Sequence, residues 1–242
     1  MKRLSLVLLA VVLLGGCSRQ QHRPRLIVIL LDTSGSIEPD AEAQCMDAIS
    51  KLVQKIDRGD RVSIIPITGD AEVQSTGRVL RFEKPPHRTA YDADLIQFSR
   101  QVQQSLQEFR ARVIAKPTSK TDIFGGIRMA AEEFAAAPAY DGNLIIFSDF
   151  IEDDGQVDFK IDRRLRTKEA ANQYAIQTYK SSSEGRFMRK TYLGLLQSRD
   201  LQGLDRPRRE AIREFWVEYF KTSGGNPQYA VDGVGLVLDQ VN

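Results

Sequence analysis

Residues 26–36 read LIVILLDTSGS, so six consecutive apolar residues lead directly into Asp32, Ser34 and Ser36. An uninterrupted apolar run of this length is typical of a strand buried on both faces of a parallel sheet. Open α/β sheets bind ligands at the carboxyl ends of their strands, and carboxylate and hydroxyl oxygens suit hard divalent cations. The stretch therefore predicts a cation site at one sheet edge. The structural alternative is that Asp32 caps a helix and the two serines shape a turn.

Two later segments carry matching oxygen ligands. Thr121 begins an amphipathic segment, and Asp149 follows the apolar run 143–147. With these segments the chain resembles the von Willebrand factor A domain family, whose metal-ion-dependent adhesion site takes an Asp, two Ser, a Thr and a second Asp from three loops. The resemblance covers roughly residues 26–242 and implies a single domain there. It implies that the cation, Mg²⁺ or else Mn²⁺ or Ca²⁺, is held directly or through water by Asp32, Ser34, Ser36, Thr121 and Asp149.

Apolar runs alternate with segments of helical period, which predicts a three-layer α/β fold. Its centre is a doubly wound, mostly parallel sheet with helices on both faces, as in Rossmann-like folds. We expect strands at 26–31, 61–67, 143–147, 192–196 and 234–238, and an edge strand or hairpin within 72–82. We expect helices over 95–113, 123–134 and 205–224, the last with an aromatic stripe that packs in the core. The period of segment 170–180 is ambiguous.

Bulky residues stand beside the predicted site, where the family often has smaller ones. Phe150 follows Asp149, where Gly is frequent in the family, and Phe124 follows closely after Thr121. Either these rings pack into the core, or they face the metal. In the second case Phe124, Phe150 and Ile151 form a rim that could anchor an apolar group of a partner.

The first residues predict export and a lipid anchor. Lys2 and Arg3 precede the apolar run 6–14, which is shorter than the roughly 20 residues that span a bilayer. Leu14-Gly15-Gly16-Cys17 resembles the lipobox of bacterial lipoproteins; an ordinary secretory signal is the alternative. The resemblance implies a signal peptide over 1–16, a lipid-modified Cys17 and a polar tether over 17–25. Because Ser18, and not Asp, follows Cys17, we expect attachment to the outer membrane, facing the periplasm.

Composition excludes some partners. The chain has 34 Lys and Arg against 32 Asp and Glu, and removing residues 1–16 would delete Lys2 and Arg3, leaving 32 of each sign. A neutral domain has no general attraction for nucleic acid. Cys45 has no intramolecular partner once Cys17 carries lipid, and its spacing with Ile49 and Leu52 predicts a core position on a helix.

These residues favour a protein-binding module of the cell envelope, anchored to the membrane and dependent on a divalent metal, over an enzyme. The partner is expected to be a protein that offers an Asp or Glu carboxylate to the open metal position. One alternative is a metal-dependent phosphoryl hydrolase of the haloacid dehalogenase type, but such enzymes need an acid where Ser34 stands. A metal-free scaffold with the same fold is the other alternative. His22 and His87 are the only histidines, which disfavours a His-based zinc site or a Ser-His triad.

Overall fold

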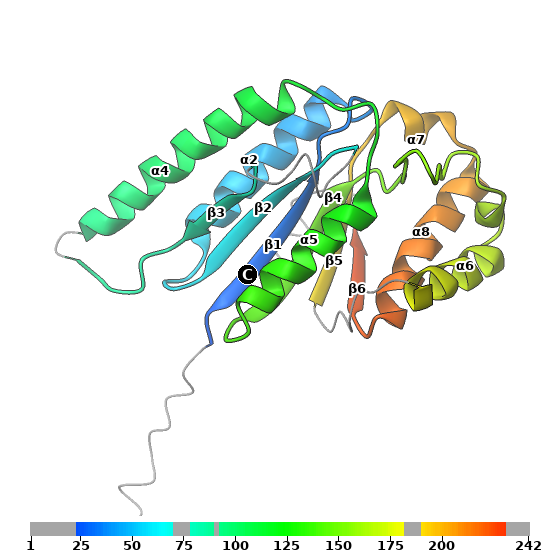
Figure 1. Cartoon of the computed structure of the whole chain (residues 1–242). Coiled ribbons are helices and arrows are strands. Elements are labelled where there is room, and N and C mark those ends of the chain that lie inside the picture. Colours follow the sequence, from blue (N-terminus) through cyan, green and yellow to red (C-terminus); the bar gives the residue numbers. More distant parts are fainter. Residues whose placement is uncertain (1–22, 70–77, 90–91, 182–189, 231–242) are drawn as a thin grey trace, which may run out of the picture.

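The computed structural model describes residues 23–69, 78–89, 92–181 and 190–230 (Figure 1). At its centre is a six-stranded sheet with the strand order β3-β2-β1-β4-β5-β6, in which only the β2–β3 pair is antiparallel. The strands are β1 (Arg25–Asp32), β2 (Arg61–Ile67), β3 (Leu80–Glu83), β4 (Asp141–Ser148), β5 (Lys190–Leu195) and β6 (Asn226–Ala230). The predicted α/β fold with a mostly parallel central sheet is confirmed.

Helices cover both faces of the sheet, as Figure 1 shows. One face packs against α2 (Pro39–Lys55), α4 (Ala93–Phe109) and the π-helical turn η2 (Arg110–Ile114) that continues α4. The other face packs against α5 (Ile123–Ala136), α6 (Lys168–Ser181) and α8 (Arg206–Thr222). Two short helices, η3 (Arg163–Leu165) and α7 (Arg199–Gly203), lie in connecting segments. Cys45 is fully buried on α2, as its spacing predicted.

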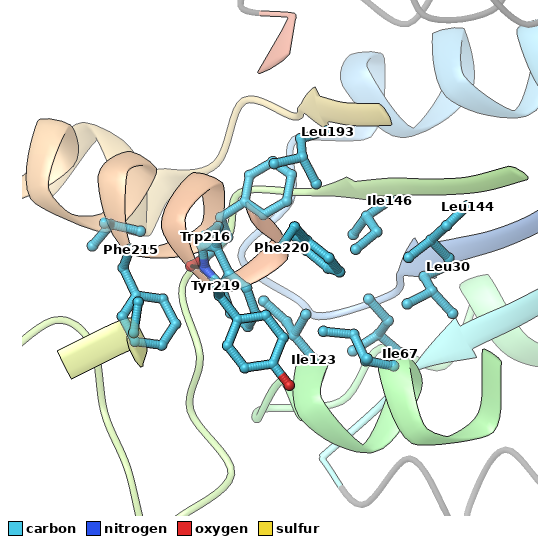
Figure 2. Packing of buried hydrophobic residues seen from close by; sticks show 14 of the residues in the cluster. Leu30, Ile67, Ile123, Leu144, Ile146, Leu193, Phe215, Trp216, Tyr219 and Phe220 are labelled. Atoms are coloured by element: carbon cyan, nitrogen blue, oxygen red, sulfur yellow. Dashed lines mark hydrogen bonds between the residues drawn. The ribbon is translucent and has the colours of Figure 1, made fainter. Parts of the chain in front are cut away.

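The aromatic residues of α8 form a large part of the core on one side of the sheet. Phe215, Trp216, Tyr219 and Phe220 are each at most 1% exposed. In Figure 2 they lie among aliphatic side chains from the sheet strands and α5. The predicted core role of this stripe is confirmed. Asp205 caps α8 by accepting a hydrogen bond from the backbone N–H of Arg208 at 2.8 Å, which fixes where the helix begins.

Some elements differ from those predicted. β6 was not expected, because Asn226–Ala230 is polar and includes Pro227; it lies at the edge of the sheet, where proline is tolerated. The ambiguous segment forms α6. β3 overlaps the end of the edge strand or hairpin predicted within 72–82, of which residues 72–77 lie outside the described residues. The predicted strand 234–238, the signal peptide 1–16 and Cys17 lie outside the described residues. Within the described ranges, no helix is both long and apolar enough to cross a membrane.

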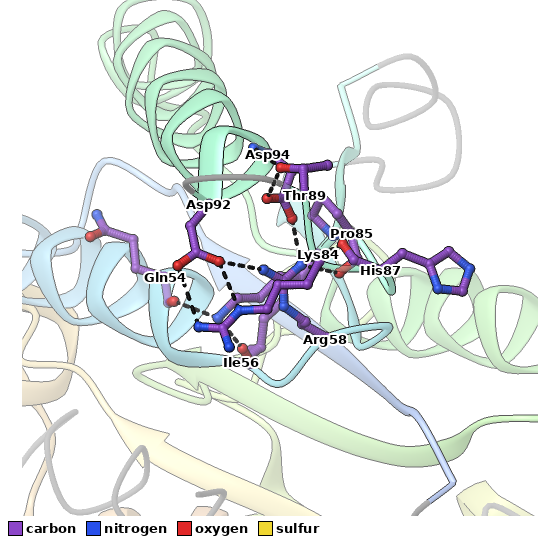
Figure 3. A network of polar contacts seen from close by, with 10 residues as sticks. Gln54, Ile56, Arg58, Lys84, Pro85, His87, Thr89, Asp92 and Asp94 are labelled. Atoms are coloured by element: carbon purple, nitrogen blue, oxygen red, sulfur yellow. Dashed lines mark hydrogen bonds and ion pairs between the residues drawn. The ribbon is translucent and has the colours of Figure 1, made fainter.

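Polar contacts fix the loops at the amino-terminal ends of the parallel strands, opposite to the carboxyl end of β1. Arg58, after α2, forms ion pairs with Asp92 and Asp94 at the start of α4 and donates a hydrogen bond to the carbonyl of His87 (Figure 3). Lys84 donates to the carbonyl of Ile56 in the same network. His87 is exposed in this loop and takes part through its backbone, so it has no role in the candidate site.

Candidate metal centre

The two predicted acidic ligands lie at the topological switch point of the sheet. From β1 the chain continues to β2 on one side, whereas β4 lies on the other side of β1. β1 and β4 are parallel, with Leu31 opposite Phe147. Asp32 is the last residue of β1, and Asp149 directly follows β4. Their carboxylates therefore meet at one edge, where doubly wound sheets bind ligands.

The loop after β1 connects the carboxylates through hydroxyl groups. Oδ1 of Asp32 accepts a hydrogen bond from the backbone N–H of Ser34 at 2.9 Å. The hydroxyl oxygens of Ser34 and Ser36 are 3.0 Å apart, and the Ser36 hydroxyl donates to Oδ2 of Asp149 at 3.4 Å. The helix-cap alternative for Asp32 is wrong, because the next helix, α2, begins at Pro39 with Glu38 at its N-cap position.

Thr121 joins this group from the loop before α5. Its backbone exchanges two hydrogen bonds with Asp153, both of 2.9 Å, so the loop that carries Thr121 is tied to the segment after Asp149. A pocket of about 500 Å³ is lined by Ser34, Ser36, Thr121 and Asp149. Asp32 is only 1% exposed and is hydrogen-bonded to the loop that lines this pocket. The structure thus brings the five predicted residues to one place.

The donor set fits a hard divalent cation. Around an ion with octahedral bonds of about 2.05 Å, neighbouring ligand oxygens lie about 2.9 Å apart. The 3.0 Å between the hydroxyls of Ser34 and Ser36 matches this spacing, and the 3.4 Å from Ser36 to Asp149 is slightly wider. In the part of the chain that the structure describes, no group of three or more His, Cys, Asp or Glu side chains could hold a metal. A metal held here would take hydroxyl oxygens as well as carboxylates, a donor set that suits Mg²⁺ or Mn²⁺ better than zinc.

Both carboxylates are electrostatically costly without a cation. Burial raises the pKa of Asp32, and burial together with the neighbouring Asp32 carboxylate raises the pKa of Asp149 to about 7. Among the described residues neither carboxylate forms an ion pair. A doubly charged cation would offset the repulsion between them and favour their ionised forms.

Two serines that support the site had no sequence signature. The Ser148 hydroxyl donates to Oδ2 of Asp32 at 2.7 Å, and the Ser198 hydroxyl bonds to the Asp149 carboxylate. Both serines are fully buried. Ser198 also accepts the backbone N–H of Leu201 at 2.9 Å and so begins α7. Hydrogen bonds of this kind, from residues that do not themselves bind a metal, orient the side chains that would bind it.

The predicted apolar rim is wrong for Phe150, and Phe124 packs against the aromatic core. Phe150 has a φ of 63° and is 1% exposed, with its ring 5.7 Å from that of Tyr229. Its carbonyl accepts a hydrogen bond from Nε1 of Trp216 at 2.9 Å. Phe124 is half-buried and packs 4.9 Å from the Trp216 ring. The left-handed backbone at Phe150, which suits glycine best, turns this ring into the core. Of the three rim residues, Ile151 alone lines the pocket.

Glu152 links the Asp149 segment to the start of α5. Its Oε2 accepts the backbone N–H of Ile123 at 2.9 Å, whereas its buried Oε1 has no hydrogen-bond partner among the described residues. Burial raises the pKa of Glu152 well above its usual value, and the nearby Asp122 carboxylate adds to this shift. This raised pKa favours the neutral form of Glu152, and its hydrogen bond to Ile123 supports the loop carrying Thr121.

No family model and no curated protein sequence matches the chain. Solved structures that are similar to it include a von Willebrand factor type A protein from Catenulispora acidiphila, with 15% identity and a TM-score of 0.47. That match covers 90% of this chain and spans 41% of the other protein's chain. An aerotolerance-related membrane protein from Bacteroides fragilis matches with 16% identity and a TM-score of 0.46, over 90% of this chain and 96% of that one. The structural neighbours thus include von Willebrand factor A proteins, the family that the loops of Asp32, Thr121 and Asp149 resemble.

Proposed function

We propose that this chain is a divalent-metal-dependent protein-binding module held at a bacterial membrane by lipid on Cys17. The observation that carries the proposal is the convergence of Asp32, Ser34, Ser36, Thr121 and Asp149, from three loops, at one pocket of the sheet edge.

Each ligand type has its own role in this module. Asp32 and Asp149 supply two negative charges and so match the charge of the ion, while Ser34, Ser36 and Thr121 supply neutral oxygens that fix its position. When bound, the cation offers an electrophilic position for an Asp or Glu carboxylate of a partner protein. The pocket opens to solvent above these side chains, so a partner segment can approach.

The same residues favour binding over phosphoryl hydrolysis. A hydrolase of the haloacid dehalogenase type would need a general acid or base at position 34, where the chain has a serine hydroxyl that bonds to Ser36. The lysine that lines the pocket, Lys160, is held by two carboxylates. The raised pKa values of Asp32 and Asp149 also favour an occupied site over a metal-free scaffold, since a cation would offset the cost of ionising two neighbouring buried carboxylates.

The membrane part of the proposal rests on the N-terminal residues alone. Cys17 at the end of the lipobox-like segment would carry lipid on its sulfur and amine, and more than one chain gives stable anchoring. We extend the proposal to outer-membrane attachment, facing the periplasm, because Ser18 and not Asp follows Cys17. The polar residues between Cys17 and β1 would let the domain stand off the membrane surface.

The experiment that tests the function is capture from envelope extracts by the full-length chain, with Mg²⁺ or with a chelator. Partners should be retained only with Mg²⁺, and Asp32→Ala should lose them. Asp47→Ala is the matched control, because Asp47 is a 64% exposed acid on α2 whose ion pair with Lys51 is local to that helix. Equal capture with chelator, or by Asp32→Ala, would mean that binding is independent of the metal, as for a plain scaffold.

A further inference from the structure

Arg199, the first residue of α7, stands at the edge of the metal pocket. It lines this pocket and also a neighbouring one of about 600 Å³, which is bordered by Glu38 and Asp40 at the start of α2. Its Nη2 donates a hydrogen bond to the carbonyl of Gly35. Because Gly35 lies between Ser34 and Ser36, the guanidinium rests against the loop that supplies two metal ligands.

The backbone around Arg199 is fixed to the same loop. The Arg199 N–H donates to the carbonyl of Ser36 at 3.0 Å, and the Glu38 N–H donates to the carbonyl of Gln197 at 3.0 Å. The start of α7 and the ligand loop are thus joined by backbone hydrogen bonds at Ser36 and Glu38, on both sides of Ile37. A guanidinium held in this way is positioned before any partner arrives, which lowers the entropy cost of binding to it.

Charge distinguishes Arg199 from the other cation at the pocket. Nζ of Lys160 lies 3.3 Å from Oδ2 of Asp153 and 3.1 Å from Oδ2 of Asp200, so its charge is already matched. Arg199 is exposed and, among the described residues, has no carboxylate within ion-pair distance. Its fork of N–H donors suits a planar carboxylate better than a point charge would. Arg199 is therefore the cation of this pocket that is available to an incoming anion.

We propose that Arg199 binds a second carboxylate of the partner, so that the module selects acidic segments with at least two Asp or Glu residues close in sequence. This inference rests on the proposed function, in which the first carboxylate binds the metal. An extended segment advances about 3.3 Å per residue. An acid one to three residues from the metal-bound one can therefore reach a guanidinium that touches the ligand loop. The adjoining pocket gives room for uncharged residues of such a segment to continue past Arg199, because Glu38 and Asp40 border it.

The test measures the affinity of full-length protein for fluorescent synthetic peptides in Mg²⁺. One peptide carries a single Glu in a Gly-Ser background, and the others add a second Glu one, two or three residues away. At least one two-Glu peptide should bind wild type about fivefold more tightly than the single-Glu peptide, the size of a favourable exposed ion pair. Arg199→Met should reduce this ratio to near one. Because both peptides are measured on the same variant, a general change in its metal site affects both affinities equally and leaves their ratio unchanged.

Arg209→Met is the matched control, because Arg209 is an exposed arginine on α8 that does not line the pocket. It should keep the wild-type ratio. The inference is overturned if wild type shows no preference for a second Glu, or if Arg199→Met keeps the preference. It is also overturned if Arg199→Met abolishes binding of glycerol phosphate but leaves the peptide ratio unchanged, since Arg199 would then serve lipid headgroups. If wild type binds the single-Glu peptide equally well with and without Mg²⁺, the proposed function itself is contradicted.

Discussion

The hydroxyl of Ser148, at the end of β4, donates a 2.7 Å hydrogen bond to Oδ2 of Asp32, at the end of β1. The same hydroxyl oxygen accepts the backbone N–H of Phe150 at 2.9 Å. Ser148 therefore connects the first predicted metal ligand to the segment that contains the last one, Asp149. With Ser34 bonded to Oδ1, the Asp32 carboxylate is held on both of its oxygens. This fixed orientation is what a cation site with defined geometry requires.

Ser148→Ala should weaken Mg²⁺ binding by about tenfold or more, because it removes the contact that orients Asp32. Isothermal titration calorimetry measures the change. Ser63→Ala is the matched control: Ser63 is also a buried serine on a central strand, but it donates to Glu133 at 2.7 Å, away from the pocket. An equal loss of affinity in both variants would show that the effect is general destabilisation and not ligand orientation.

Phe150→Ala should lower the free energy of unfolding by about 3 to 5 kcal/mol, as for other buried Phe truncations. Urea unfolding with and without Mg²⁺ measures this. Stabilisation by Mg²⁺ should persist in the variant, because Asp149 keeps its 2.9 Å bond from the backbone N–H of Ile151. A wild-type unfolding midpoint combined with weaker partner capture would instead show that the ring acts as a surface anchor.

Glu152→Gln should fold like wild type at pH 5, because it keeps an acceptor for Ile123 and the raised pKa of Glu152 favours the neutral side chain that Gln resembles. Glu152→Ala should cost about 1 to 3 kcal/mol by leaving that N–H unpaired.

The raised pKa of Glu152 also predicts that the stability of wild type, but not of Glu152→Gln, depends on the ionisation of this side chain. A raised pKa in the folded state means that stability is lost as pH rises above the ordinary carboxyl range toward the folded value. Wild type should therefore lose stability relative to Glu152→Gln between pH 5 and pH 8, in urea unfolding. A constant difference would show that Glu152 is ionised in the fold.

Cys17→Ser should abolish incorporation of radiolabelled palmitate and leave uncleaved precursor or soluble protein. Cys45→Ala is the control within the chain, because Cys45 is buried in α2 and should have no part in lipidation. Labelling of Cys17→Ser at the wild-type level would remove the basis for a lipid anchor.

The ends of buried strands were predictable because an apolar run followed by a carboxylate can be recognised from the local sequence alone. Asp32 and Asp149 were found in this way, and Thr121 followed from the family resemblance. The supporting residues were not predictable. Ser148 and Asp32 are 116 positions apart, and a single serine at a strand end has no pattern that names its partner.

Side-chain direction at the site also escaped prediction. Whether Phe150 faces the metal or the core depends on one backbone angle, its φ of 63°, and a phenylalanine gives no signal of a left-handed conformation. β6 was missed for a related reason. An edge strand is only partly buried, so Asn226–Ala230 needs no apolar run and pairs through its backbone with β5.

The most direct test of the account is a Mg²⁺ titration of the full-length protein, with thermal unfolding followed at each concentration. A cation bound by the native state alone adds RT ln(1 + [L]/Kd) to stability, so the melting temperature of wild type should rise steadily with Mg²⁺. Asp32→Ala should show no such rise, whereas Asp47→Ala should behave like wild type. A wild-type melting temperature that does not change with Mg²⁺, Mn²⁺ or Ca²⁺ would contradict the claim that Asp32, Ser34, Ser36, Thr121 and Asp149 form a metal site.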